Sequence, residues 1–345
     1  MISKSGYILT YIALSIVIAL LFLMNLWYGS ISIPWDAVFA TLFGSSESTS
    51  TEVIIMQYRL PQAITAIAIG MGLSIAGLLL QTTFNNPLAG PSVLGISAGA
   101  SLGVAFLVLF GSVTGFHIGG TSIFASELWM VMAAFTGAIL VLLIIIFVSG
   151  KIGNAVTVLI IGIMIGYLVS AIVGTLQFFS SSEDLHSFVL WGLGSFSKTN
   201  LNQSITILAI TILFFVATLL FVKPLNALLL GYRYAVTSGY NVKVLQTIFI
   251  LFAGFLIALG TAFTGPIAFI GLAVPHIARN ITRTSNHATL LPATLLIGAA
   301  LALVCNFMSK MPGFDATLPI NAVTSIVGAP IVIWVIIKGR RISNG

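Results

Sequence analysis

The sequence predicts an all-α polytopic membrane protein, and three observations support that prediction. Hydrophobic residues make up 59% of the 345 residues and charged residues only 6%, whereas a soluble domain carries about 25% charged residues. Apolar runs of about 20 residues, the length that a helix needs to cross a bilayer, recur along the whole chain. The charged residues fall between these runs or close to their ends, and none lies in the middle of one.

Ten apolar runs fit the chain with short connections between them. We expect the spans, in chain order, at residues 7–26, 60–82, 93–110, 128–148, 156–178, 201–222, 244–262, 263–283, 290–307 and 318–337. Five spans is an odd number, so the second half must enter the membrane with the opposite orientation. We therefore predict ten transmembrane helices in two inverted five-helix halves, about 1–200 and 201–345, within a single transmembrane domain.

The distribution of charge sets the orientation of these spans. Alternating spans place ten of the 13 basic residues on the same side as Lys4, and only Arg59, Lys198 and Lys310 on the other side. Short cytoplasmic loops carry an excess of Lys and Arg, so both termini are predicted to be cytoplasmic. All seven acidic residues fall on the outer side, which agrees with the same span count.

Two apolar segments are interrupted, at 85–95 after the second span and at 263–275 after the seventh. Proline removes a backbone donor and clashes with the preceding turn. Interruptions at corresponding places of inverted repeats point to a transport pathway at the repeat interface; a kinked helix without a special role is the alternative. The expected break and pathway residues are Gly265, Pro266 and Pro275, together with Gly95, Gly99 and Gly103, whose spacing puts three glycines on one helix face, where another backbone can approach closely.

Several classes of activity lack the residues that they need. The chain has no Gly-x-x-x-x-Gly-Lys-Ser/Thr loop, so it cannot hold ATP in the P-loop manner. We predict no catalytic residue, bound metal or cofactor, because the four histidines and Cys305 suit surface or packing roles. Most basic residues lie on one side of the predicted spans, which the orientation of the protein in the membrane explains. They do not indicate nucleic-acid binding. The lack of an intramembrane carboxylate disfavours an ion-coupled secondary transporter, which stays the rival class.

A set of short motifs is spread over nearly the whole chain. They are Arg59-Leu60-Pro61, Asn86-Pro87-Leu88-Ala89, Leu94-Gly95-Ile96-Ser97-x-Gly99, Trp191-x-x-Gly194-Ser195, the run from Gly265-Pro266 to Pro275-His276-Ile277-x-Arg279, Leu318-Pro319-Ile320 and Gly328-Ala329-Pro330. Together they resemble the FecCD-type permeases, the membrane subunits of ABC importers for iron-siderophore complexes, haem and cobalamin.

The resemblance implies partners that the chain itself does not contain. They are a second permease subunit, in a homodimer, two cytoplasmic ABC ATPases that bind ATP and Mg, and an external substrate-binding protein. It also implies a bacterial inner membrane and a role as a transport subunit, not an enzyme. An iron-siderophore is the first substrate expected, with haem and cobalamin as alternatives.

The resemblance also implies roles for particular residues. The ATPase would grip the cytoplasmic segment 223–243, with Leu230, Gly231, Arg233 and Gly239 as coupling residues. The cytoplasmic gate would include Asn86, Leu88, Ala155 and Val156. Arg59 and Lys310 would receive carboxylates of the binding protein; anchoring of helix ends by long basic side chains is the alternative. The sequence departs from the family at Tyr232-Arg233, where acidic residues are common, and at Gln62, where many members have arginine.

Overall fold

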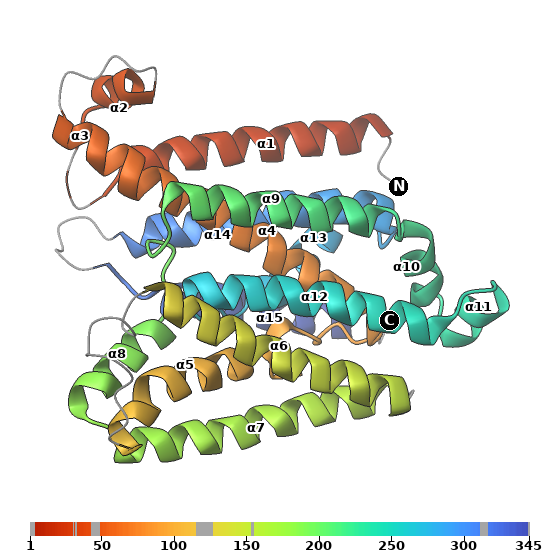
Figure 1. Ribbon diagram of the computed structural model, residues 1–345. Helices are drawn as coiled ribbons and strands as arrows, with labels where there is room; N and C mark the ends of the chain where they lie inside the picture. The colour runs from red at the N-terminus through yellow and green to blue at the C-terminus, as the bar shows by residue number, and fades with distance from the viewer. Residues whose placement is uncertain are drawn as a thin grey trace. The chain divides into compact units, whose positions relative to one another are not determined.

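The computed structural model describes residues 4–29, 31, 33–42, 49–114, 127–152, 155–310 and 317–343. Within these ranges every regular element is a helix (Figure 1). The elements are α1 (Lys4–Trp27), α2 (Trp35–Leu42), α3 (Thr49–Val53), the π-helix η1 (Ile54–Arg59), α4 (Leu60–Thr83), the 3-10 helix η2 (Pro91–Leu94), α5 (Ile96–Thr114), α6 (Glu127–Ile152), α7 (Ala155–Phe179), α8 (Ser182–Gly192), α9 (Leu201–Leu219), α10 (Val222–Leu229), α11 (Tyr232–Thr237), α12 (Val242–Thr264), α13 (Ile270–Thr282), α14 (His287–Ser309) and α15 (Ile320–Ser343).

Seven helical segments are long and apolar enough to cross a membrane: Ser5–Trp27, Ser50–Thr83, Glu127–Ile152, Val156–Phe179, Leu201–Leu219, Val242–Thr264 and His287–Ser309. Two shorter apolar stretches, Ile96–Phe110 and Ile320–Trp334, occupy the places of the predicted third and tenth spans. The predicted eighth span falls on α13, which has only 13 residues. The all-helical fold is confirmed, while the count of ten spans and their division into two inverted halves stay predictions.

The helices group into two compact units, and neither is a sequential half of the chain. Unit 1 contains Met1–Ile75, Ser195–Leu219 and Phe269–Gly345. In it α14 packs against α1, α13 and α15. The backbones of α4 and α14 also meet closely, since a Cβ atom on Gly70 would lie 2.3 Å from the carbonyl oxygen of Gly298.

Unit 2 contains Ala76–Gly194 and Leu220–Ala268, with α5 in contact with α6, α7, α8 and α12. The short helices α10 and α11 lie in the same unit, beyond the end of α12 (Figure 1). Together α10 and α11 make up most of the segment 223–243, whose cytoplasmic location stays a prediction.

Two predicted helix boundaries differ from the structure. The helix that contains the second predicted span begins near Ser50 and not at residue 60, because α3, the π-helix and α4 form one continuous helical segment. The residues at which the chain enters the membrane stay a prediction. The helix also does not break at Pro275, which lies inside α13. Prolines are tolerated inside membrane helices where neighbouring helices satisfy the freed backbone groups, and α13 packs against both α14 and α15.

Candidate functional site

The first helix break separates α4 from α5. After Thr83 the backbone turns at Asn85, which has a positive φ of 45°. The Asn86 side-chain oxygen then accepts the backbone N–H of Leu88 at 2.9 Å, and Gly95, with φ 71°, ends η2. Asn86, a predicted gate residue, thus shapes the turn, while the Leu88 side chain is exposed at its tip.

The second break lies between α12 and α13. Gly265 follows the last residue of α12 with φ 74° and ψ 178°, and a Cβ atom there would lie 2.5 Å from the carbonyl oxygen of Trp191. Glycine is therefore required at this position for conformation and for space. Pro266 follows, and α13 begins only after Phe269, which takes the left-handed conformation with φ 65°. The break predicted at Gly265 and Pro266 is confirmed as a helix end.

Gly99 and Gly103 lie on the face of α5 that packs on α6, and Gly95, just before α5, lies against α7. Added Cβ atoms would lie 2.8 Å from the Gly162 carbonyl oxygen, 2.6 Å from that of Gly137 and 1.9 Å from that of Ala133, respectively. Close backbone approach at this glycine row is thus confirmed. A role of the same glycines in lining a pathway stays a prediction.

The remaining predicted gate residues begin α7. Ala155 is its first residue, and the Val156 side chain is exposed on the surface. Their role in a gate stays a prediction.

The predicted coupling residues lie in and around α11: Leu230 and Gly231 form the turn that joins α10 to α11, Arg233 lies within α11, and Gly239 follows it. Gly231 precedes α11 with φ 107° and ψ 158°, and Gly239 follows it with φ 84°. Among the described residues, and apart from the two chain neighbours, no atom lies within 4 Å of an added Cβ at either glycine. The Leu230 and Arg233 side chains are exposed. The turn therefore presents its side chains outward, while the recognition of an ATPase by it stays a prediction.

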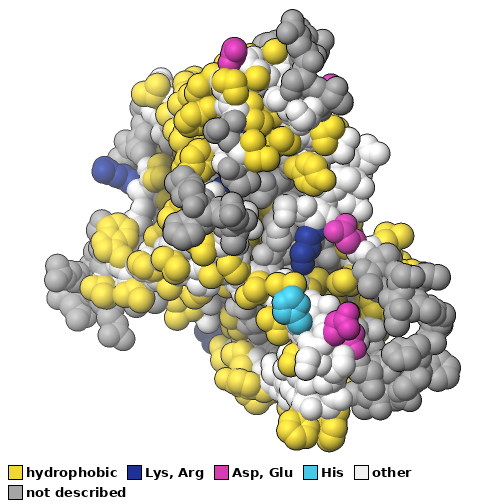
Figure 2. Space-filling model, turned by 90° about the vertical axis from the view of Figure 1, so that its left-hand side faces the viewer, with side chains coloured by type: hydrophobic (Ala, Val, Ile, Leu, Met, Phe, Trp, Pro, Cys, Tyr) yellow, Lys and Arg dark blue, Asp and Glu magenta, His cyan; other side chains and the backbone are white. Residues whose placement is uncertain are grey.

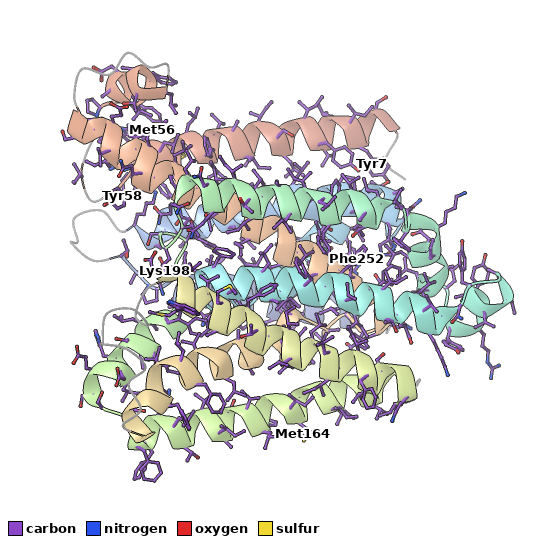
Figure 3. The ribbon with its side chains drawn as sticks, viewed as in Figure 1. Tyr7, Met56, Tyr58, Met164, Lys198 and Phe252 are labelled. Atoms are coloured by element: carbon purple, nitrogen blue, oxygen red, sulfur yellow. The ribbon has the colours of Figure 1, made fainter. Side chains whose placement is uncertain are left out.

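Arg59 and Lys310 meet at the C-terminal end of α1, and both are buried. Their exposed fractions are 5% and 6%, whereas Tyr58, labelled in Figure 3, is 62% exposed on the same helix as Arg59. Arg59 donates from Nη1 to the carbonyl oxygen of Leu26 at 2.8 Å and also to that of Trp27. Lys310 donates from Nζ to the carbonyl oxygen of Asn25 at 2.8 Å.

These contacts satisfy the free carbonyl groups that end α1. The last four carbonyls of a helix have no partner inside it, and cations are favourable at that end. Here the Met24 carbonyl accepts the N–H of Tyr28, and the next three accept from the Lys310 and Arg59 side chains. This is the geometry that the helix-anchor alternative predicts. Docking of a binding protein at these two residues stays a prediction.

Burial also changes the charge state of Lys310, which lies just beyond the last residue of α14. Removal of its amine from water, together with the nearby positive charge of Arg59, lowers its pKa from 10.5 to about 7. The amine is therefore easier to deprotonate than a lysine amine in water.

Two amides in the same cluster were missed by sequence reasoning. Asn306 donates from Nδ2 to Asn25 Oδ1 at 2.8 Å, and Asn25 donates from Nδ2 to the carbonyl oxygen of Leu303 at 3.1 Å. Both side chains are fully buried. Each of the two apolar runs has an uncharged amide near its end. Because buried polar groups require partners, this pattern could have indicated that the two amides pair.

Among the described residues, no three His, Cys, Asp or Glu side chains gather in a way that would hold a metal ion. The predicted lack of a bound metal or cofactor is not tested by this finding.

The chain matches the model of the FecCD transport family over residues 16–338. It belongs to the FecCD transport family. The FecCD relatives include the vitamin B12 import system permease protein BtuC of Salmonella typhi, 30% identical over 96% of this chain and 95% of that protein. BtuC of Escherichia coli O9:H4 (strain HS) is 31% identical over 84% of this chain and 85% of its own length.

Solved structures agree with the FecCD assignment. A transporter assigned to the metal-chelate ABC type, in an inward-facing conformation, matches with a TM-score of 0.81 and 28% identity, over 95% of this chain and 99% of that one. PsaBC from Streptococcus pneumoniae matches with a TM-score of 0.53 at 14% identity, over 86% of this chain and 95% of that one, and supports the fold alone. The chain is thus a membrane permease subunit of the ABC importer class, as the sequence motifs indicated.

Proposed function

We propose that this FecCD permease moves a large metal chelate into the cytoplasm by alternating access, powered by ATP hydrolysis in a partner. The observation that supports the proposal most strongly is the family match along residues 16–338. The helices of the chain also break at the two predicted places. Broken membrane helices lie where the backbone lines a cavity or is buried in protein. Ten spans in two inverted halves, with both termini in the cytoplasm of a bacterial inner membrane, belong to this proposal.

For the substrate, the proposal is a chelate of the iron-siderophore or cobalamin kind, with haem as the further alternative. The printed names of BtuC and of the metal-chelate transporter support that class. The described part of the predicted spans contains no Asp or Glu away from the helix ends. A largely uncharged wall suits a bulky chelate that must not bind too tightly to leave.

The proposed assembly contains two copies of this chain, two ATPases and one external binding protein. The exposed turn between α10 and α11 is the part of the chain that we propose contacts the ATPase. Its side chains project from short helices at the end of α12, so a partner can reach them without unfolding a span. The lack of a P-loop in this chain leaves ATP hydrolysis to that partner.

Uptake by the reconstituted complex tests the proposal. The permease, its ATPase and its binding protein are placed in proteoliposomes, and uptake of cyanocobalamin, a ferric siderophore and haem is measured with and without ATP. We expect ATP-dependent uptake of one chelate, and none when the P-loop lysine of the ATPase is replaced.

The rival class gives a different result in the same vesicles. Uptake by this chain alone, driven by an ion gradient and indifferent to ATP, would establish a secondary transporter and overturn the proposal.

A further inference from the structure

The short helix α2 (Trp35–Leu42) has three distinct faces. Val38 and Thr41 are buried against the rest of unit 1. Trp35, Phe39 and Leu42, at the helical spacing i, i+4 and i+7, form one apolar stripe with exposed fractions of 40%, 43% and 36%. The remaining face carries Asp36, which is exposed. We call Trp35, Phe39 and Leu42 the α2 stripe.

The position of α1 sets the depth of α2 in a membrane. The segment Ser5–Trp27 is long and apolar enough to cross a bilayer, and its most apolar window holds no buried residue. Exposed side chains such as Ile8, Ile12 and Leu20 are therefore covered by lipid if the span crosses the membrane. In that case Trp27, the last residue of α1, lies where the hydrocarbon ends and the headgroups begin.

The α2 stripe is in direct contact with Trp27 at the end of α1. The Trp35 ring stacks on the Trp27 ring, with centroids 4.7 Å apart and planes 13° from parallel. Trp35 also stacks on Phe39, at 6.2 Å and 26°. The stripe thus starts at the end of a membrane span, and Figure 1 shows α2 beside that end of α1.

Hydrogen bonds from Arg59 hold this connection in place. Its guanidinium donates to the carbonyls of Leu26 and Trp27 at the end of α1, and to that of Ile31 on the way to α2. One buried side chain therefore fixes the path of the backbone between the two helices. Ile31 is itself exposed, which extends the apolar surface between Trp27 and the α2 stripe.

We propose that α2 lies in the lipid headgroup region of the outer leaflet, with the α2 stripe inserted among the acyl chains and Asp36 turned to water. Tryptophan is enriched at this level of membranes, and amphipathic helices insert their apolar face about 5–10 Å into it. Three side chains on an eight-residue helix are also few for a protein partner, since standard interfaces involve about 20–30 residues a side. Figure 2 views the side on which α2 lies, and hydrophobic side chains are exposed there.

Site-directed fluorescence tests the proposal in the full-length protein. Cys305, the only cysteine, is replaced by alanine, and Phe39→Cys or Asp36→Cys is labelled with the environment-sensitive dye NBD. The protein is reconstituted into phosphatidylcholine vesicles, with spin-labelled phosphatidylcholine as the lipid quencher and iodide as the aqueous quencher. We expect a blue-shifted emission and lipid quenching at position 39, and iodide quenching at position 36.

The pair of labels distinguishes the proposal from its alternatives. Positions 36 and 39 are both exposed on the same helix, so neither label disturbs the core, and thermal melting checks that both variants fold. Equal iodide quenching at the two positions would overturn the proposal. So would a position-39 label that is shielded only after an external binding protein is added, because the α2 stripe would then be a protein-docking surface.

Discussion

The glycines of α5 and those around α11 serve opposite purposes, although both sets belong to unit 2. Along α5 the backbone is an ordinary helix, and Gly99 and Gly103 leave no space for a methyl group. Around α11 the space is open, and Gly231 and Gly239 instead have positive φ values. One set is required for packing and the other for backbone conformation.

This difference predicts where damage will appear. A side chain added to a crowded helix pair costs global stability, because interiors are packed as densely as organic crystals. A side chain added to an open turn strains only that turn, so the fold survives while the function of the turn is lost. The predictions below test this contrast, and then extend it to the buried cations of unit 1.

The largest effect is expected from Gly103→Ala. The new methyl group would lie 1.9 Å from the Ala133 carbonyl oxygen, so α5 and α6 must separate, at a cost of about 3 kcal/mol, the upper end of usual overpacking penalties. The melting temperature of the purified protein in detergent measures this loss. Gly174→Ala in α7 is the matched control, because nothing lies within 4 Å of its Cβ position; it should stabilise by up to about 1 kcal/mol. Similar losses in both variants would contradict the packing role.

A loss of about 2–3 kcal/mol is expected from Arg59→Met, which leaves buried carbonyls of α1 without their charged donor. The same melting assay measures it, and the exposed Lys243→Met should change little. If Arg59→Met melts normally but takes up no substrate in the reconstituted complex, the docking role is correct and the anchoring role is wrong.

Gly231→Val should lower the melting temperature less than Gly103→Ala does, because the exposed turn can relax, and it should uncouple ATP hydrolysis from uptake. Its φ of 107° with ψ 158° is accessible essentially only to glycine, and a side chain there costs about 1–3 kcal/mol locally. ATPase activity stimulated by loaded binding protein, compared with uptake, measures the coupling. Ser238→Val is the control, since it adds a β-branched side chain at an exposed position with ordinary backbone angles. Normal coupling in Gly231→Val would show that the turn has no part in energy transfer.

The smallest effect concerns pH. The folded-state pKa of Lys310 is about 7, below its unfolded value of 10.5, so the unfolded chain binds more protons between these values. Stability should therefore rise with pH, by about 1 kcal/mol between pH 6 and pH 8. The contribution is complete above the unfolded pKa and is lost as pH falls through about 7. Melting scans at the two pH values should show the rise, and Lys310→Met should remove it; an unchanged rise in that variant would assign it to another group.

The sequence predicted the helix break at Gly265 and Pro266 for a local physical reason. A glycine that can take a positive φ and a proline that lacks an N–H act on the backbone beside them. Pro275 was read in the same way, yet α13 continues through it. Whether a membrane helix tolerates a proline depends on which neighbours satisfy the freed carbonyl, and the packing of α13 is not encoded in adjacent residues.

The burial of Arg59 and Lys310 was equally beyond local reasoning. Lys310 lies at the end of α14, as predicted, whereas Arg59 lies inside the continuous helical segment Ser50–Thr83 and not at a helix end. Their partners are backbone carbonyls of α1, which lies far away in the chain. Every residue has a backbone carbonyl, so the sequence does not show which ones need a partner. Only Asn25, an amide in an apolar run, hinted that this helix end is a polar site inside the protein.

The contact between Phe269 and Gly328 has a consequence for the evolution of this sequence. Phe269 holds a left-handed conformation, and a Cβ atom on Gly328 would lie 2.3 Å from the Phe269 Cβ. Residues in direct contact do not respond independently to substitution. We therefore expect the two positions to change together among related genes, with a side chain at 328 appearing only in lineages whose residue 269 has become glycine, because any other residue keeps the Cβ atom.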